Sequence, residues 1–167
     1  MKNLKIFLLL VLIANSFWSC EKDDICEAGT ATTPRLIIEF YDNEVVINKK
    51  IVTNLVVDTD TEVGILKFSG VSKIEIPLKT SAIVTEYNFR LTTGETIPTA
   101  INSDKISINY TKSDTYISRA CGFKTVFKLK PTNGFDLISD ANNWIKSYVV
   151  EKPNVLNENE THVKIYF

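Results

Sequence analysis

The chain has 167 residues and an almost balanced charge, with 19 basic and 20 acidic side chains. It lacks the cluster of lysines and arginines that nucleic-acid binding requires, so we expect no nucleic-acid partner. The length fits one domain, because chains of this size bury roughly 68–70% of their unfolded surface.

The first residues have the pattern of a secretory signal peptide. Two lysines precede the unbroken apolar run Ile6–Ala14. This run is too short for a transmembrane helix, which needs roughly 20 apolar residues. The small residue Ser19 then precedes Cys20, and we predict cleavage between them, which removes residues 1–19.

The residues around Cys20 resemble a bacterial lipoprotein signal, in which the cysteine becomes the lipidated first residue of the mature chain. Phe17 and Trp18 replace the usual leucine and small residue, as in the looser signals of Bacteroidota lipoproteins. Lys22–Asp24 resembles the short signal that routes such proteins to the cell surface, although a solvated tether has the same composition. The resemblance implies an outer-membrane lipoprotein at the cell surface or periplasmic face, held by acyl chains on Cys20.

Cys26 and Cys121 are the two cysteines that remain after Cys20 is assigned to lipid. In an oxidising compartment their default state is a disulfide. Two free buried thiols, or a metal or redox site, are the alternatives. A zinc site is disfavoured because the sequence has no CxxC pair and a single histidine. A disulfide between them would stabilise the fold by about 4–5 kcal/mol, because the closed loop lowers the entropy of the unfolded chain.

We expect residues 20–33 to form the lipidated N-terminus and a polar tether, and residues 34–167 to form one β domain. Alternating apolar residues bounded by turn-forming residues predict its strands. The predicted strands are Leu36–Tyr41, Val45–Ile47, Ile51–Val57, Val63–Phe68, Lys73–Leu78, Ile83–Leu91, Lys105–Tyr110, Tyr116–Cys121, Phe123–Leu129, Trp144–Val150 and His162–Phe167.

Several local features sharpen this pattern. Thr111–Asp114 predicts a turn between two paired strands, and Gly122 predicts a bulge. Pro77 marks a sheet edge or strand end, because proline cannot donate to a ladder. Trp144–Val150 also has helical spacing, but Ile145, Tyr148 and the two valines favour a strand.

Short strands with turn signals about every ten residues are typical of an all-β domain. We predict a single antiparallel β-sandwich of the immunoglobulin-like kind. A small β-barrel is the alternative.

Motifs that carry chemistry are scarce. Asp58, Asp60 and Glu62 alternate as calcium ligands might, but Val63 stands where an EF-hand-like loop has glycine. A solvated hairpin tip is the other interpretation, and the one we favour. His162 is the single histidine and reads as an ordinary strand residue. We therefore predict no catalytic residues, no metal and no cofactor.

Beyond the signal, three segments are similar to a family of uncharacterised Bacteroidota lipoproteins. These segments are Cys26 with Thr33–Tyr41, Arg119–Phe123, and His162–Phe167. The resemblance covers the mature chain and implies a single exported domain without an assigned activity. It also makes the pairing of Cys26 with Cys121 more attractive.

We therefore expect a non-enzymatic, lipid-anchored binding or accessory protein whose partner is an envelope protein or a glycan. Six tyrosines could stack on sugars or fill the core. A hydrolase is the alternative, with a carboxylate pair that the sequence does not single out.

Overall fold

A computed structural model of the chain describes residues 25–44, 48–61, 64–93, 100–138 and 140–167. Within these ranges the structure contains eleven strands and falls into two compact units. The described part of the smaller unit is residues 25–30 with 116–123, and the remainder forms the larger unit. The described residues contain no helix long and apolar enough to cross a membrane.

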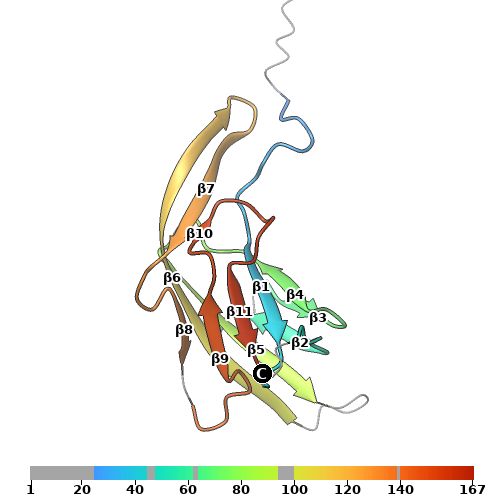
Figure 1. Cartoon of the computed structure of the whole chain (residues 1–167). Helices are drawn as coiled ribbons and strands as arrows, with labels where there is room; N and C mark the ends of the chain where they lie inside the picture. Colours follow the sequence, from blue (N-terminus) through green and yellow to red (C-terminus); the bar gives the residue numbers. More distant parts are fainter. Residues whose placement is uncertain (1–24, 45–47, 62–63, 94–99, 139) are drawn as a thin grey trace, which may run out of the picture. The chain divides into compact units, whose positions relative to one another are not determined.

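The larger unit contains a four-stranded sheet in the order β4-β1-β11-β9 (Figure 1). Its strands are β1 (Leu36–Tyr41), β4 (Lys73–Ile76), β9 (Ser147–Val150) and β11 (Val163–Tyr166). β1 pairs antiparallel with β4 but parallel with β11, so one pair departs from the antiparallel pattern that we predicted. β9 and β11 are antiparallel, as expected.

The second sheet has the order β10-β7-β6-β5-β2-β3, and β8 pairs with β6. Two of its strands, β6 (Ala100–Ser118) and β7 (Gly122–Leu129), continue into the smaller unit, whose second segment is Tyr116–Phe123. The other strands are β2 (Leu55–Asp58), β3 (Leu66–Phe68), β5 (Val84–Thr93), β8 (Phe135–Ile138) and β10 (Asn154–Val155).

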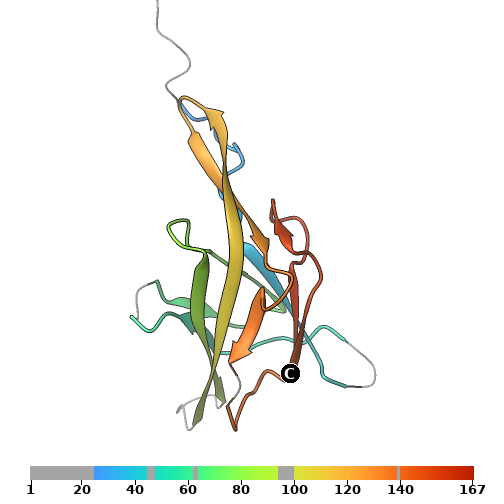
Figure 2. The same ribbon diagram turned by 90° about the vertical axis from the view of Figure 1, so that its left-hand side faces the viewer.

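The core of the larger unit lies between the two sheets (Figure 2). Leu36, Ile38 and Phe40 of β1 are fully buried, and they join buried residues of the other sheet such as Phe89 and Ile106. Each sheet keeps two edge strands, so neither closes into a barrel. The predicted all-β sandwich is therefore confirmed.

The predicted turn at Thr111–Asp114 is wrong, because this segment lies inside the continuous strand β6. Every residue from 111 to 116 is exposed, so polar residues that usually favour turns remain solvated within an extended strand. The chain reverses instead at residues 119–121. Gly122 follows as the first residue of β7 with a left-handed φ of 70°, which glycine adopts without strain, and the predicted bulge there stays a prediction.

Other predicted boundaries shift for local reasons. Trp144–Val150 is not helical, and its strand begins only at Ser147. The strand predicted from Ile51 begins at Leu55, because Asn54 has a left-handed φ of 52°. The predicted strand Val45–Ile47 lies outside the described residues. β8 and β10 are short strands that the pattern did not predict.

Candidate functional site

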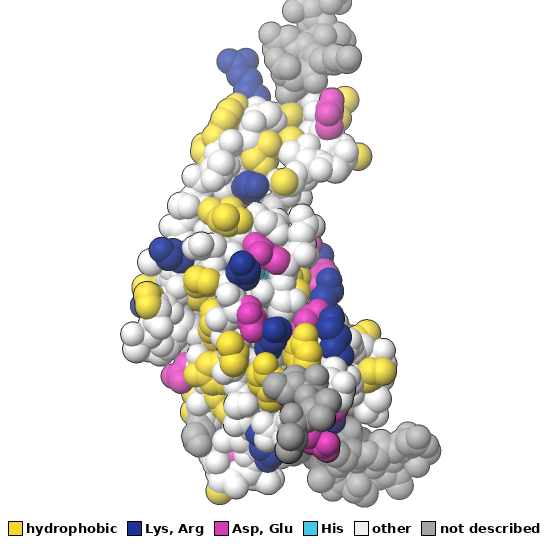
Figure 3. Space-filling model, viewed as in Figure 1, with side chains coloured by type: hydrophobic (Ala, Val, Ile, Leu, Met, Phe, Trp, Pro, Cys, Tyr) yellow, Lys and Arg dark blue, Asp and Glu magenta, His cyan; other side chains and the backbone are white. Residues whose placement is uncertain are grey.

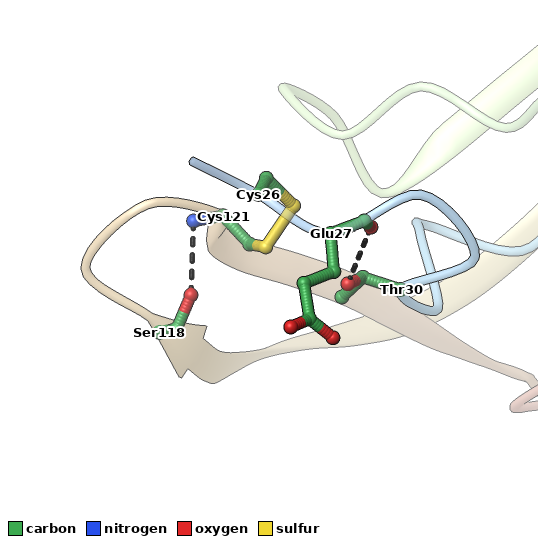
Figure 4. The surroundings of a disulfide bond; sticks show 5 residues. All are labelled: Cys26, Glu27, Thr30, Ser118 and Cys121. Atoms are coloured by element: carbon green, nitrogen blue, oxygen red, sulfur yellow. Dashed lines mark hydrogen bonds between the residues drawn. A yellow bond between two sulfur atoms is a disulfide. The ribbon is translucent and has the colours of Figure 1, made fainter. Parts of the chain in front are cut away.

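The disulfide-bonded hairpin tip is the first candidate site, and we define it as the described residues of the smaller unit, 25–30 and 116–123. A disulfide joins Cys26 to Cys121 with their Cα atoms 4.8 Å apart, as the sequence predicted (Figure 4). The Cys121 N–H donates to Ser118 Oγ at 3.0 Å, which closes the turn. The Thr30 hydroxyl donates to the Glu27 carbonyl at 2.8 Å. Covalent and turn contacts therefore hold this unit together.

The hairpin tip encloses an open hollow of about 440 Å³. Glu27 is the one acidic side chain among the residues that line it, and Arg119 is the one basic side chain. The remaining lining residues are Ile25, Thr30, Tyr116, Ile117, Ser118, Ala120 and Cys121. The lining therefore mixes apolar and polar groups, with one side chain of each charge.

A second hollow, of about 340 Å³, lies on the larger unit. The Phe135 ring beside it contacts the Tyr148 ring, with centroids 5.1 Å apart. Burial raises the pKa of Tyr148, and the nearby Asp136 carboxylate raises it further. The hollow is lined by Lys130, Pro131, Asn133, Gly134, Phe135, Tyr148, Val150 and Pro153, and this set contains no carboxylate. It is the second candidate site.

Two residues of the calcium candidate, Asp58 and Asp60, each form an ion pair with a basic side chain. Asp58 is the last residue of β2, only 1% exposed and paired with Arg90, so it does not lie in the solvated tip that we favoured. Asp60 accepts hydrogen bonds at 2.8 Å from Lys105 and from Asn88, and the Lys105 contact lowers its pKa.

Glu62 lies outside the described residues, as does Cys20. Among the described residues, no group of three histidine, cysteine or acidic side chains could hold a metal ion.

His162 is fully buried just before β11. Its Nδ1 accepts the Ile37 N–H at 2.9 Å, which leaves Nε2 to carry the proton. Burial lowers the pKa of His162, so the ring stays neutral. Its backbone N–H also donates to the Ile37 carbonyl at 3.1 Å, which makes His162 a connector of β1 and β11.

Asp104 of β6 is a buried carboxylate that sequence reasoning missed. Its two oxygens accept the N–H groups of Trp144 at 3.2 Å and Ile145 at 2.8 Å. Burial raises its pKa, against the opposing effect of these hydrogen bonds. Asp104 therefore fixes the segment before β9. No sequence signal distinguished it from the other acidic residues.

Charged side chains on the face of the four-stranded sheet lie in pairs of opposite sign (Figure 3). Lys49 lies 2.7 Å from Glu39, and Lys164 lies 2.9 Å from Glu151. Two of the tyrosines, Tyr87 and Tyr110, are core residues and cannot form a sugar-stacking surface. These two tyrosines belong to β5 and β6, whereas on the four-stranded sheet the half-buried rings of Tyr41 and Tyr166 contact each other, with centroids 5.7 Å apart.

Comparison with known proteins gives one match. Residues 43–167 match a family of unknown function, DUF6452. The chain belongs to this family. The match begins at residue 43, after Cys26, and includes Cys121, so only one of the two disulfide-bonded cysteines lies within the matched residues. No curated protein and no solved structure matches the chain.

Proposed function

We propose that this DUF6452 protein is a lipid-anchored envelope protein with a non-enzymatic binding or accessory role. It would be held to the outer membrane by acyl chains on Cys20, at the cell surface or periplasmic face. Its partner would be an envelope protein or a glycan.

The Cys26–Cys121 disulfide is the observation that carries this proposal. Disulfides persist in oxidising compartments and are rare in the cytosol, so the bond supports export. The sequence has three cysteines, and the bond accounts for two of them. The third is Cys20, which follows the predicted cleavage position directly and is available for lipid.

The two hollows support binding over catalysis. A glycoside hydrolase of the usual kind needs two carboxyl groups facing each other across its substrate. Among the described residues that line these hollows, Glu27 is the single carboxylate. A hollow with one acidic group and several apolar groups can still hold a partner through shape and hydrogen bonds.

The anchor is tested with Cys20→Ala in the full chain. We expect this variant to leave the membrane pellet for the soluble fraction, and the unaltered chain to carry an acyl mass on Cys20. The double variant Cys26→Ser/Cys121→Ser is the matched control, because it removes two cysteines and should stay in the membrane. An unmodified Cys20, with unchanged fractionation of Cys20→Ala, would refute the proposal.

The binding role is tested by cross-linking the lipidated protein in native membranes and identifying captured components by mass spectrometry. We expect one envelope component to be captured reproducibly, and to be lost when Lys130→Ala and Tyr148→Ala alter the hollow of the larger unit. Capture of nothing above the level of an unrelated lipoprotein would count against a binding role.

A further inference from the structure

The hairpin tip exposes three apolar side chains. Ile25 is 79% exposed, Phe123 is 67% exposed and Tyr116 is 56% exposed. The Tyr116 and Phe123 rings contact each other edge to face, with centroids 5.3 Å apart and an interplanar angle of 66°. Because the two rings contact each other, they present one continuous apolar surface to their surroundings instead of two separate side chains.

The same unit is tied to the predicted lipid anchor. Cys26 is bonded to Cys121, and Cys20 stands six residues before Cys26. Six residues span at most about 20 Å, even when fully extended at about 3.3–3.6 Å each. If Cys20 carries acyl chains, the hairpin tip is held within that distance of the bilayer surface.

The chemistry of the hairpin tip matches the interfacial layer of a bilayer. Aromatic side chains favour this layer because their rings are apolar while a tyrosine hydroxyl stays hydrated. The apolar Ile25 and Phe123 can enter the boundary between headgroups and acyl chains. Arg119 is exposed in the turn between Tyr116 and Phe123, where its guanidinium can donate to lipid phosphate.

We propose that the hairpin tip inserts Tyr116 and Phe123 into the interface of the bilayer that holds Cys20. The inference rests on the proposed lipid anchor. It adds a second membrane contact, next to the acyl chains, which would orient the smaller unit on the membrane rather than leave it free to rotate. The occupant of this surface is thus lipid, and not a second copy of the chain or another protein.

The test places a fluorescent probe at the hairpin tip of the full, lipidated protein. Phe123→Trp and, separately, Tyr116→Trp are reconstituted in vesicles of phosphatidylethanolamine and phosphatidylglycerol, with or without bromine on the acyl chains. Ile51→Trp is the matched control, since Ile51 is 60% exposed and belongs to the larger unit. The unaltered protein provides the background emission of the buried Trp144.

We expect tryptophan emission at positions 116 and 123 to shift to shorter wavelength and to be quenched by brominated lipid. Emission at position 51 should show neither change. Equal quenching at all three positions, or none at the hairpin tip, would overturn the inference. A blue shift that depends on protein concentration and not on brominated lipid would indicate a protein partner, and would also overturn it.

Mass spectrometry of the same samples separates the two proposals. An acyl mass on Cys20 without quenching at positions 116 and 123 leaves the proposed anchor standing and refutes the inserted hairpin tip. Absence of the acyl mass refutes both, because the short connection to a bilayer is then lost.

Discussion

The sandwich and the hairpin tip are stabilised by different physical means. The sandwich has a contiguous apolar core, and Leu36, Ile38 and Phe40 show no solvent exposure. In the hairpin tip, none of the described residues is buried, and a disulfide with three turn hydrogen bonds maintains the structure. Apolar burial therefore stabilises one unit, whereas covalent closure holds the other.

The largest effect is expected from the core. Phe40→Ala should destabilise the sandwich by about 3–5 kcal/mol, because it removes a fully buried ring and leaves a cavity. Urea unfolding followed by far-UV circular dichroism measures this loss. The exposed Phe123→Ala is the matched control and should change stability by about 0.5 kcal/mol or less. Similar losses for both variants would contradict the contrast between the two units.

The second largest effect on stability is expected from removing the disulfide. The double variant Cys26→Ser/Cys121→Ser should lower stability by about 2–4 kcal/mol, chiefly because its unfolded chain gains entropy. The bond joins residues 95 positions apart, which makes the closed loop a long one. Limited proteolysis should then cut near residues 25–30 while the sandwich remains resistant. A variant with an unchanged melting temperature and unchanged cleavage would contradict this role.

Asp104→Ala is expected to cost about 2–3 kcal/mol, since the buried N–H groups of Trp144 and Ile145 would lose their acceptors. Thermal melts compare it with Asp60→Ala, which alters an exposed carboxylate and should change stability by about 0.5 kcal/mol or less. If both variants have the same melting temperature, Asp104 does not hold the segment before β9 in the way that its hydrogen bonds indicate.

The smallest effect is expected at Glu158, which accepts the Arg35 backbone N–H at 2.9 Å and both ends of its guanidinium at 2.7 Å. These bonds lower the pKa of Glu158 from 4.5 to about 2. A lowered folded-state pKa gives stability that is complete above 4.5 and lost as pH falls towards 2.

Because both side chains are partly exposed, Glu158→Gln should cost only about 0.5–1 kcal/mol at neutral pH. Urea titrations across this pH range should show a weaker acid dependence for the variant than for the parent chain. An identical acid dependence would show that Glu158 does not contribute to the loss of stability at low pH.

Much of the sandwich could be predicted from alternation alone, since Leu36, Ile38 and Phe40 occupy every second position and all face the core. The continuous strand β6 could not, because Thr111–Asp114 has the composition of a turn and no neighbouring residue reveals that it stays extended. The parallel pairing of β1 with β11 was equally hidden, since strand alternation carries no information on distant partners.

The candidate site was predictable in part. The cysteine pairing followed from the compartment that the signal sequence implies, and the structure contains that bond. The exposed pair Tyr116 and Phe123 was not predicted, because an alternating strand normally buries one of its faces. Asp104 was missed since an acidic residue is expected at the surface unless its partners are known.

The parallel pairing of β1 with β11 has a consequence for biosynthesis. Ile37 and His162, which are bonded across this pair, are 125 residues apart in sequence. While the intervening chain is being made, one edge of β1 keeps its N–H and C=O groups unpaired beside strongly apolar side chains. Such an edge is a template for pairing with other chains. The four-stranded sheet can therefore be completed only after β11 has been made, and until then β1 keeps an edge that other chains could pair with.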